Sequence, residues 1–157
     1  MHPNEALIHR FYTCFQARDG AGMAACYHPN VRFSDAVFIG LEGERAGAMW
    51  QMLCERGKDL TVEFRDVVAD DRGGSAHWDA RYTFSTTGRR VLNRIDARFD
   101  FDGGKIIGHR DAFDFPAWAK QALGPVGWLF GWSGMLQRAI QKQALKGLDA
   151  YIARRAR

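Results

Sequence analysis

The stretch Arg89–Asp102, RRVLNRIDARFDFD, decides the fold of this chain of 157 residues, together with Gly103-Gly104 and Lys105–Phe113, KIIGHRDAF. Apolar and polar residues alternate through both long segments, as is typical of β-strands with one buried face. A Gly-Gly pair between two such segments is typical of a tight hairpin. The sequence therefore predicts two long antiparallel strands.

Two more strands are predicted before this hairpin, over Leu60–Ala69 and Ser75–Thr86. Asp70–Gly74 separates them, and Thr87-Gly88 leads into Arg89, so both connections carry turn residues. Four long strands joined by short turns indicate an antiparallel meander. Long strands in a small domain must twist and curl, which gives the sheet a concave face.

Helical spacing replaces strand alternation in the first 57 residues. Helices are predicted over Asn4–Arg18, from Asp19 to Tyr27, and over Glu44–Arg56, with a short strand over Val31–Asp35. His28-Pro29-Asn30 is expected to end the second helix. The predicted fold class is α+β: a cone-shaped domain in which three N-terminal helices pack on a highly curved, mainly antiparallel sheet and enclose a pocket.

The chain divides into a domain over residues 1–116 and a C-terminal helical extension over residues 117–157. Within the apolar segment Val126–Leu136, Gly127–Trp132 is expected to be flexible, whereas Met135–Arg155 is typical of a basic amphipathic helix. We interpret the extension first as a lid or a dimer-packing element. The alternative is a peripheral contact with a membrane surface, which its tryptophans and basic residues favour.

Composition indicates a soluble globular protein, with 46% hydrophobic and 25% charged residues. No signal peptide precedes Asn4, so a cytoplasmic location is expected. The net charge of +4 comes from the tail, where six basic residues and one acid follow Gln137, so nucleic-acid binding is not expected. The three cysteines have no paired spacing, and neither disulfides nor a metal site is expected.

Ionisable residues fall on strand faces that should be buried. Ile107, His109, Asp111 and Phe113 share one face of the last strand, and Asp35 follows the inward-facing Phe33. A carboxylate in an apolar cavity has a raised pKa and can act as a base near neutral pH. Asp111, His109 and Asp35 are therefore the candidate catalytic residues.

Further residues could shape a ligand site on the same faces. The candidates for hydrogen bonding and for apolar contact with a ligand are Tyr12, Trp50, Trp78, Tyr82, Asn93 and Phe99. Structural roles stay open beside the functional ones. Asp35 could cap a loop, His109 and Asp111 could bond each other, and the aromatic residues could simply fill the core.

Three segments carry a family resemblance: Leu7–Tyr12, Tyr27–Asp35 and Gly103–Asp114. They resemble the SnoaL-like group of the nuclear transport factor 2 superfamily, which includes ketosteroid isomerase and limonene epoxide hydrolase, over about Leu7 to Phe115. The resemblance implies a cystatin-like cone fold with a hydrophobic pocket, and a homodimer formed through the outer face of the sheet.

The resemblance also implies roles for single residues. Asp35 takes the position of the isomerase general base, Asp111 takes that of the last-strand aspartate of the cyclases and epoxide hydrolases, and Phe11 takes that of the isomerase's oxyanion tyrosine. The expected function is cofactor-free acid–base chemistry (isomerisation, cyclisation, dehydration or hydrolysis) on a hydrophobic carbonyl or hydroxyl compound. The alternative is a non-catalytic ligand-binding or dimerisation module of the same fold.

Overall fold

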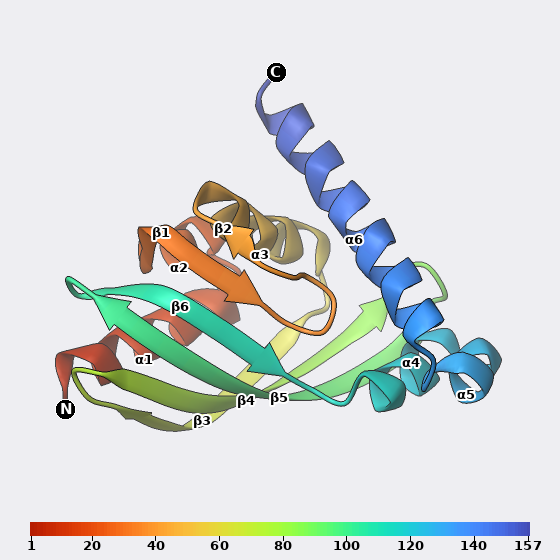
Figure 1. The fold of residues 1–157 in the computed structure, drawn as a ribbon, viewed down its shortest axis with the longest axis horizontal. Helices are drawn as coiled ribbons and strands as arrows, with labels where there is room; N and C mark the ends of the chain where they lie inside the picture. Colours follow the sequence, from red (N-terminus) through yellow and green to blue (C-terminus); the bar gives the residue numbers. More distant parts are fainter.

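The computed structural model describes residues 1–157 and has the predicted α+β architecture (Figure 1). Three helices come first: α1 (Pro3–Gln16), α2 (Gly20–Ala25) and α3 (Glu44–Arg56). Pro3 stands at the start of α1, where its missing N–H costs nothing, and Asp19 caps α2 by accepting a hydrogen bond from the Gly22 amide.

Six strands form one curved sheet in the order β2-β1-β6-β5-β4-β3. Their bounds are β1 (Tyr27–Ser34), β2 (Leu41–Glu42), β3 (Thr61–Ala69), β4 (Gly73–Phe84), β5 (Arg89–Asp102) and β6 (Lys105–Ala112). Every neighbouring pair is antiparallel except β1 and β6, which run parallel. This pairing brings the first strand beside the last and so places the turn after β1 close to the end of β6.

The main core lies between α1–α3 and the concave face of the sheet. Aromatic rings dominate it, and Phe11, Phe15 and Trp50 are each at most 2% exposed. Phe15 and Trp50 contact each other edge to face, with ring centroids 5.2 Å apart. The helices therefore close one side of the cone with large apolar side chains.

Three more helices follow the sheet: α4 (Phe115–Leu123), α5 (Pro125–Phe130) and α6 (Gly134–Arg155). Helix α4 covers the start of β5, where Trp118 and Phe115 join Val91 in a second apolar cluster. Helix α6 runs beside α3 (Figure 1) and is anchored by Leu148 and Tyr151, its two buried residues, which belong to the main core.

Two local predictions were wrong. The second helix was expected to reach Tyr27 and to be ended by His28-Pro29-Asn30, but α2 ends at Ala25, and the three residues lie within β1, where a register shift between Tyr27 and Arg32 accommodates the proline. The segment expected to be flexible forms most of α5, whose backbone packs directly against α4. A Cβ at Gly127 would lie only 1.9 Å from the Ala119 carbonyl oxygen, so glycine permits this close approach.

The prediction that Ile107 faces the core was wrong, because a β-bulge lies at this residue of β6. The pairing shifts between Asp100 and Phe101, so that Ile107 is an extra residue in its strand. As a result Ile106 is fully buried, whereas Ile107 is only half-buried. Alternation beyond the bulge is regular, and His109 pairs with Phe99 while Asp111 pairs with Ala97.

The six helices include none whose length and apolarity together would let it cross a bilayer.

Candidate functional site

An apolar cavity lies between the helices and the sheet and has a volume of about 320 Å³. Fifteen of its 22 lining residues are hydrophobic. Helix α3, strands β4 and β5, the end of β6 and helix α4 all contribute walls. Its polar and charged side chains are Asp35, Arg56, Tyr82, Thr83, Ser85, Asn93 and Asp111, with the indoles of Trp50, Trp78 and Trp118.

Asp111 lines this cavity from the end of β6, and its side chain is 2% exposed. Its Oδ1 lies 2.9 Å from His109 Nε2. His109 has no exposed surface and lies behind Asp111 in the core, with Phe99 against its ring at a centroid distance of 4.4 Å. His109 therefore supports Asp111 from the side opposite to the cavity.

A buried series of hydrogen bonds determines which ring nitrogen of His109 carries the hydrogen. The Trp50 indole N–H donates to Tyr27 Oη over 2.6 Å, and Tyr27 Oη lies 2.8 Å from His109 Nδ1. Because the indole can only donate, the Tyr27 hydroxyl hydrogen is free to point at Nδ1. Nδ1 then accepts and Nε2 carries the proton, which it donates to Asp111. With a neutral imidazole, every polar side-chain atom in this series has a hydrogen-bond partner.

Asp35 lies in the turn directly after β1 and also lines the cavity. Its Oδ1 accepts hydrogen bonds from the amides of Val37 (2.7 Å) and Phe38 (2.6 Å). Burial raises the pKa of the Asp35 carboxyl from its usual value of 3.8 to about 7; the Phe38 bond opposes this rise and the nearby charge of Asp111 adds to it. Asp35 thus caps a turn and also forms part of the cavity wall.

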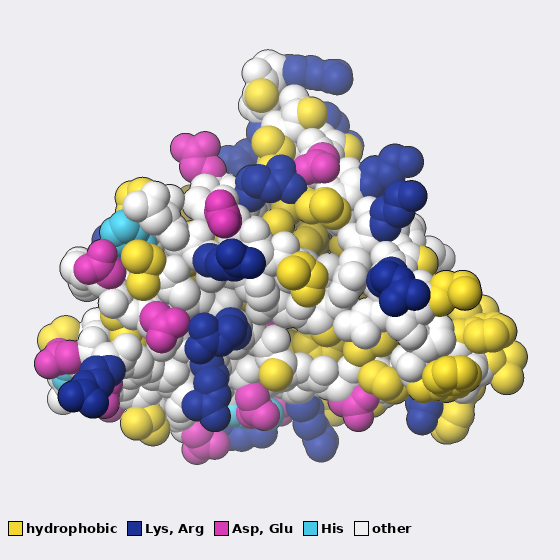
Figure 2. All heavy atoms as spheres, viewed as in Figure 1, with side chains coloured by type: hydrophobic (Ala, Val, Ile, Leu, Met, Phe, Trp, Pro, Cys, Tyr) yellow, Lys and Arg dark blue, Asp and Glu magenta, His cyan; other side chains and the backbone are white.

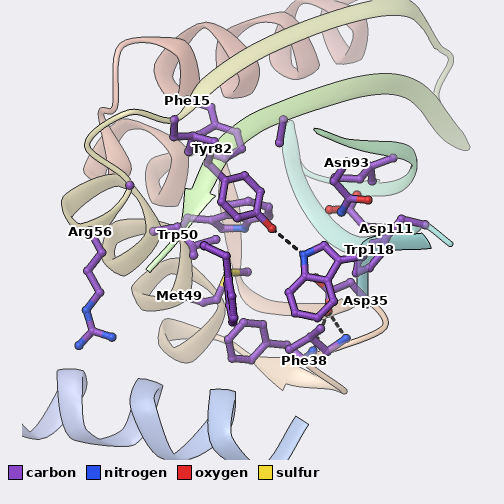
Figure 3. Close-up of a pocket in the computed structure, with 18 of the residues that line it drawn as sticks. Phe15, Asp35, Phe38, Met49, Trp50, Arg56, Tyr82, Asn93, Asp111 and Trp118 are labelled. Carbon is purple, nitrogen blue, oxygen red and sulfur yellow. Dashed lines mark hydrogen bonds between the residues drawn. The ribbon is translucent and has the colours of Figure 1, made fainter. Parts of the chain in front are cut away.

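Two neutral hydrogen-bonding groups share the cavity with the carboxylates. Tyr82 Oη accepts the indole N–H of Trp118 over 2.7 Å, which leaves the hydroxyl hydrogen free to donate. Burial raises the pKa of Tyr82, and the charge of Asp35 raises it further, so the phenol keeps its proton. The Asn93 side chain makes no hydrogen bond within the protein. Figure 3 shows Asn93, Asp111, Asp35 and Trp118 on one side of the cavity, whereas Arg56 extends away from them.

The structure brings six of the nine candidate residues to the cavity and places three behind it. Those that line it are Asp35, Trp50, Trp78, Tyr82, Asn93 and Asp111. His109, Tyr12 and Phe99 lie in the core instead. The Tyr12 hydroxyl is buried without a hydrogen-bond partner, and burial raises its pKa well above the usual value of 10.

Sequence reasoning missed Tyr27 and Trp118. Tyr27 reaches His109 only because β1 lies parallel to β6, a long-range pairing that alternation within one strand does not reveal. Trp118 follows the strands on a helix that was assigned to the extension, yet it binds Tyr82 and lines the cavity. Phe115, Trp118 and Ala122 are apolar and recur at helical spacing. This pattern was the available signal that α4 covers the sheet.

Chemically, the site is a pair of carboxylates facing an apolar space that also holds a phenol and an amide. The two carboxylates can take up and release protons, and the phenol and amide can donate hydrogen bonds to an oxygen that gains negative charge. No three His, Cys, Asp or Glu side chains come together in a way that could hold a metal ion.

The model of the SnoaL-like domain matches residues 8–109, which run from α1 into β6 and include β1. The chain belongs to the SnoaL-like family. No protein of curated function is similar enough in sequence to count as a match. The matched range contains Asp35 and His109 but ends before Asp111, and it does not reach α4 with its cavity residue Trp118 or the helices that follow it.

Solved structures with the same fold share little sequence with this SnoaL-like protein. A proposed SnoaL-like polyketide cyclase from Jannaschia sp. CCS1 has a TM-score of 0.68 and 17% identity, covering 78% of this chain and 93% of its own. An LEH-like epoxide hydrolase from M. tuberculosis has a TM-score of 0.62 and 18% identity, covering 81% and 94%. An NTF2-like protein of unknown function from Burkholderia pseudomallei K96243 has a TM-score of 0.62 and 17% identity, covering 73% and 92%. At this identity the likeness establishes the fold.

Proposed function

We propose that this SnoaL-like protein is a cofactor-free acid–base enzyme that moves a proton on a hydrophobic carbonyl compound. One observation carries the proposal: Asp111 and Asp35 line the same apolar cavity, and the pKa of Asp35 is raised to about 7. A general acid or base works best when its pKa lies near the working pH. The cavity supplies such a group beside a second carboxylate that His109 holds in place.

The reaction needs no external oxidant or reductant. The Asp111 carboxylate accepts a proton from a carbon next to the carbonyl, and the electron pair of the broken C–H bond moves into an enolate. The enolate oxygen accepts hydrogen bonds from Tyr82 and Asn93. Asp35, protonated about half the time at pH 7, returns a proton to the same or another carbon, and the carbonyl re-forms. Return to another carbon is an isomerisation; attack of the enolate on a second carbonyl is a cyclisation.

The structural neighbours support the proposed class of ligand, but they do not favour one reaction over the others. One is described as a proposed polyketide cyclase and another as an epoxide hydrolase. The apolar lining of this cavity suits a hydrophobic compound. The volume of about 320 Å³ is in the range of small-ligand sites.

Deuterium exchange tests the proposal without knowledge of the natural substrate. The probe is 2-tetralone, a bicyclic ketone with exchangeable C–H protons beside its carbonyl, followed by proton NMR in D₂O. We expect the protein to accelerate exchange, and Asp111→Asn to lower the acceleration by about 10² to 10⁴-fold. Asp102→Asn in the exposed β5–β6 turn is the matched control and should keep the full rate.

A non-catalytic ligand-binding role is the second candidate, and one observation favours it. Phe11 stands where the resembling isomerases carry a tyrosine, and it is fully buried against the His109 ring, with centroids 5.5 Å apart. It cannot donate a hydrogen bond to an enolate. If 2-tetralone binds but exchanges no faster than in buffer, the binding role stands and the enzymatic proposal fails.

A further inference from the structure

The most exposed apolar side chains of the molecule are concentrated in one segment. Ten large hydrophobic residues are exposed, and six of them fall within α5 and the start of α6: Val126, Trp128, Leu129, Phe130, Trp132 and Met135. We call this set the α5 patch. Trp132 is 78% exposed and Met135 75%. Figure 2 shows hydrophobic side chains gathered at the right-hand end, where Figure 1 places α5.

Contacts within the protein hold the α5 patch in place. Gly127 fits α5 tightly against α4, which directs the bulky neighbours of Gly127 outward. The Trp132 indole donates to the Leu129 carbonyl over 2.9 Å, and the Trp128 ring lies under the Lys120 ammonium, 4.7 Å from its centroid. The exposed rings are therefore held in place by contacts within the protein.

The segment that carries the α5 patch has charged side chains of one sign only. Residues 115–148 contain four basic side chains, Lys120, Arg138, Lys142 and Lys146, and no aspartate or glutamate. Lys120 covers Trp128 at one side, and the Arg138 guanidinium approaches Gly134 at the start of α6. In Figure 2 the dark blue side chains lie above the yellow group, in the direction in which α6 runs.

We infer that the α5 patch docks the protein on an anionic lipid surface. Exposed tryptophans beside apolar side chains suit the boundary between headgroups and acyl chains, and flanking cations are attracted to anionic lipids. A second copy of the chain fits the patch less well, since residues 115–148 offer four cations and no acid that could pair with them across such an interface. Docking would also bring α4, which carries Trp118 of the cavity wall, close to a membrane in which hydrophobic compounds dissolve.

Vesicle co-sedimentation of the full chain tests the inference, with phosphatidylglycerol–phosphatidylcholine vesicles compared with phosphatidylcholine vesicles. We expect binding to the anionic vesicles only, weakened by salt, and lowered about tenfold or more in Trp128→Ser/Trp132→Ser. Ile39→Ser/Val68→Ser removes two equally exposed apolar side chains elsewhere and should bind as the unaltered protein does.

A measurement on the unaltered protein removes any dependence on the variants' folding. Brominated acyl chains in the anionic vesicles should quench the tryptophan fluorescence, because Trp128 and Trp132 would lie among them. Absence of binding to anionic vesicles overturns the inference. So does a dimer, detected by light scattering, that Trp128→Ser/Trp132→Ser converts to a monomer, since the patch would then be an interface between copies.

Discussion

Tyr27 and His109 lie 82 residues apart in the sequence, yet the tyrosine Oη is 2.8 Å from the imidazole Nδ1. Tyr27 also accepts the Trp50 indole N–H, so one hydroxyl joins helix α3 to strand β6. All three side chains are buried. Asp111 accepts a hydrogen bond from the other nitrogen of His109. The orientation of Asp111 therefore depends on a series of hydrogen bonds that begins on helix α3.

Replacing Tyr27 by phenylalanine should destabilise the fold. Tyr27→Phe leaves Trp50 Nε1 and His109 Nδ1 buried without partners, and each unsatisfied group costs about 1–3 kcal/mol. Tyr12→Phe is the matched control, because its hydroxyl is already buried and unpartnered. Its removal should leave the free energy of unfolding unchanged or raise it by up to about 1 kcal/mol.

Urea unfolding of both variants measures this difference. The expected order of the free energy of unfolding is Tyr12→Phe at or above the unaltered protein, and Tyr27→Phe below it. Equal losses in the two variants would show that the hydroxyl of Tyr27 is not linking Trp50 to His109.

Tyr82 should affect catalysis more than binding. Its hydroxyl is free to donate into the cavity, so Tyr82→Phe removes a hydrogen bond to the enolate oxygen, which typically costs about 10²–10³ in rate. The affinity for 2-tetralone should change little, because the ring remains. Tyr151→Phe removes a hydroxyl outside the cavity and should exchange 2-tetralone normally. A Tyr82→Phe protein with the full exchange rate would exclude Tyr82 as the donor.

Asp35 should make stability depend on pH. Its folded pKa of about 7 exceeds the usual 3.8, so between about pH 4 and pH 7 the folded protein holds a proton that the unfolded chain has lost. Stability then falls as the pH rises through this range, and the loss is complete above pH 7. Asn at this position still accepts the two turn hydrogen bonds but carries no charge.

Asp35→Asn should therefore stabilise the protein above pH 7 by about 4 kcal/mol and flatten the pH dependence below it. Urea unfolding at pH 4, 6 and 8 measures both effects. Asp66→Asn, at an exposed position of β3 without a hydrogen bond or an ion pair, should retain the slope of the unaltered protein. An Asp35→Asn protein with an unchanged slope would mean that the Asp35 carboxyl titrates normally.

The fold was predictable because local signals agree with the global arrangement. Alternation in Arg89–Asp102 and the Gly103-Gly104 turn define a hairpin whose pairing the structure reproduces. The same alternation places Asp111 toward the helices, since a strand side chain can face only one of two sides. Alternation also placed Asp35 toward the core, on the face of Val31 and Phe33, and Asp35 lines the cavity from the turn directly after β1.

Contacts between distant segments were not predictable from these patterns. The parallel pairing of β1 with β6 brings Tyr27 to His109, and helix α4 returns to the sheet to bring Trp118 to Tyr82. Alternation also fails at Ile107, where a bulge inserts one residue and exchanges the two faces. An inward side chain can line the cavity, or it can lie behind the cavity wall, as His109 does. The difference depends on packing, which the alternation of apolar and polar residues in the sequence does not reveal.

Asp35 and Asp111 share one apolar cavity, closely enough for the charge of Asp111 to raise the pKa of Asp35. Carbon-13 NMR titration of protein labelled at the aspartate carboxyls tests it directly, with Asp35 assigned by its loss in Asp35→Asn. We predict a pKa near 7 for Asp35 and a lower pKa in Asp111→Asn, because removal of a neighbouring negative charge favours ionisation. An Asp35 pKa of about 4 that Asp111→Asn leaves unchanged would contradict the account.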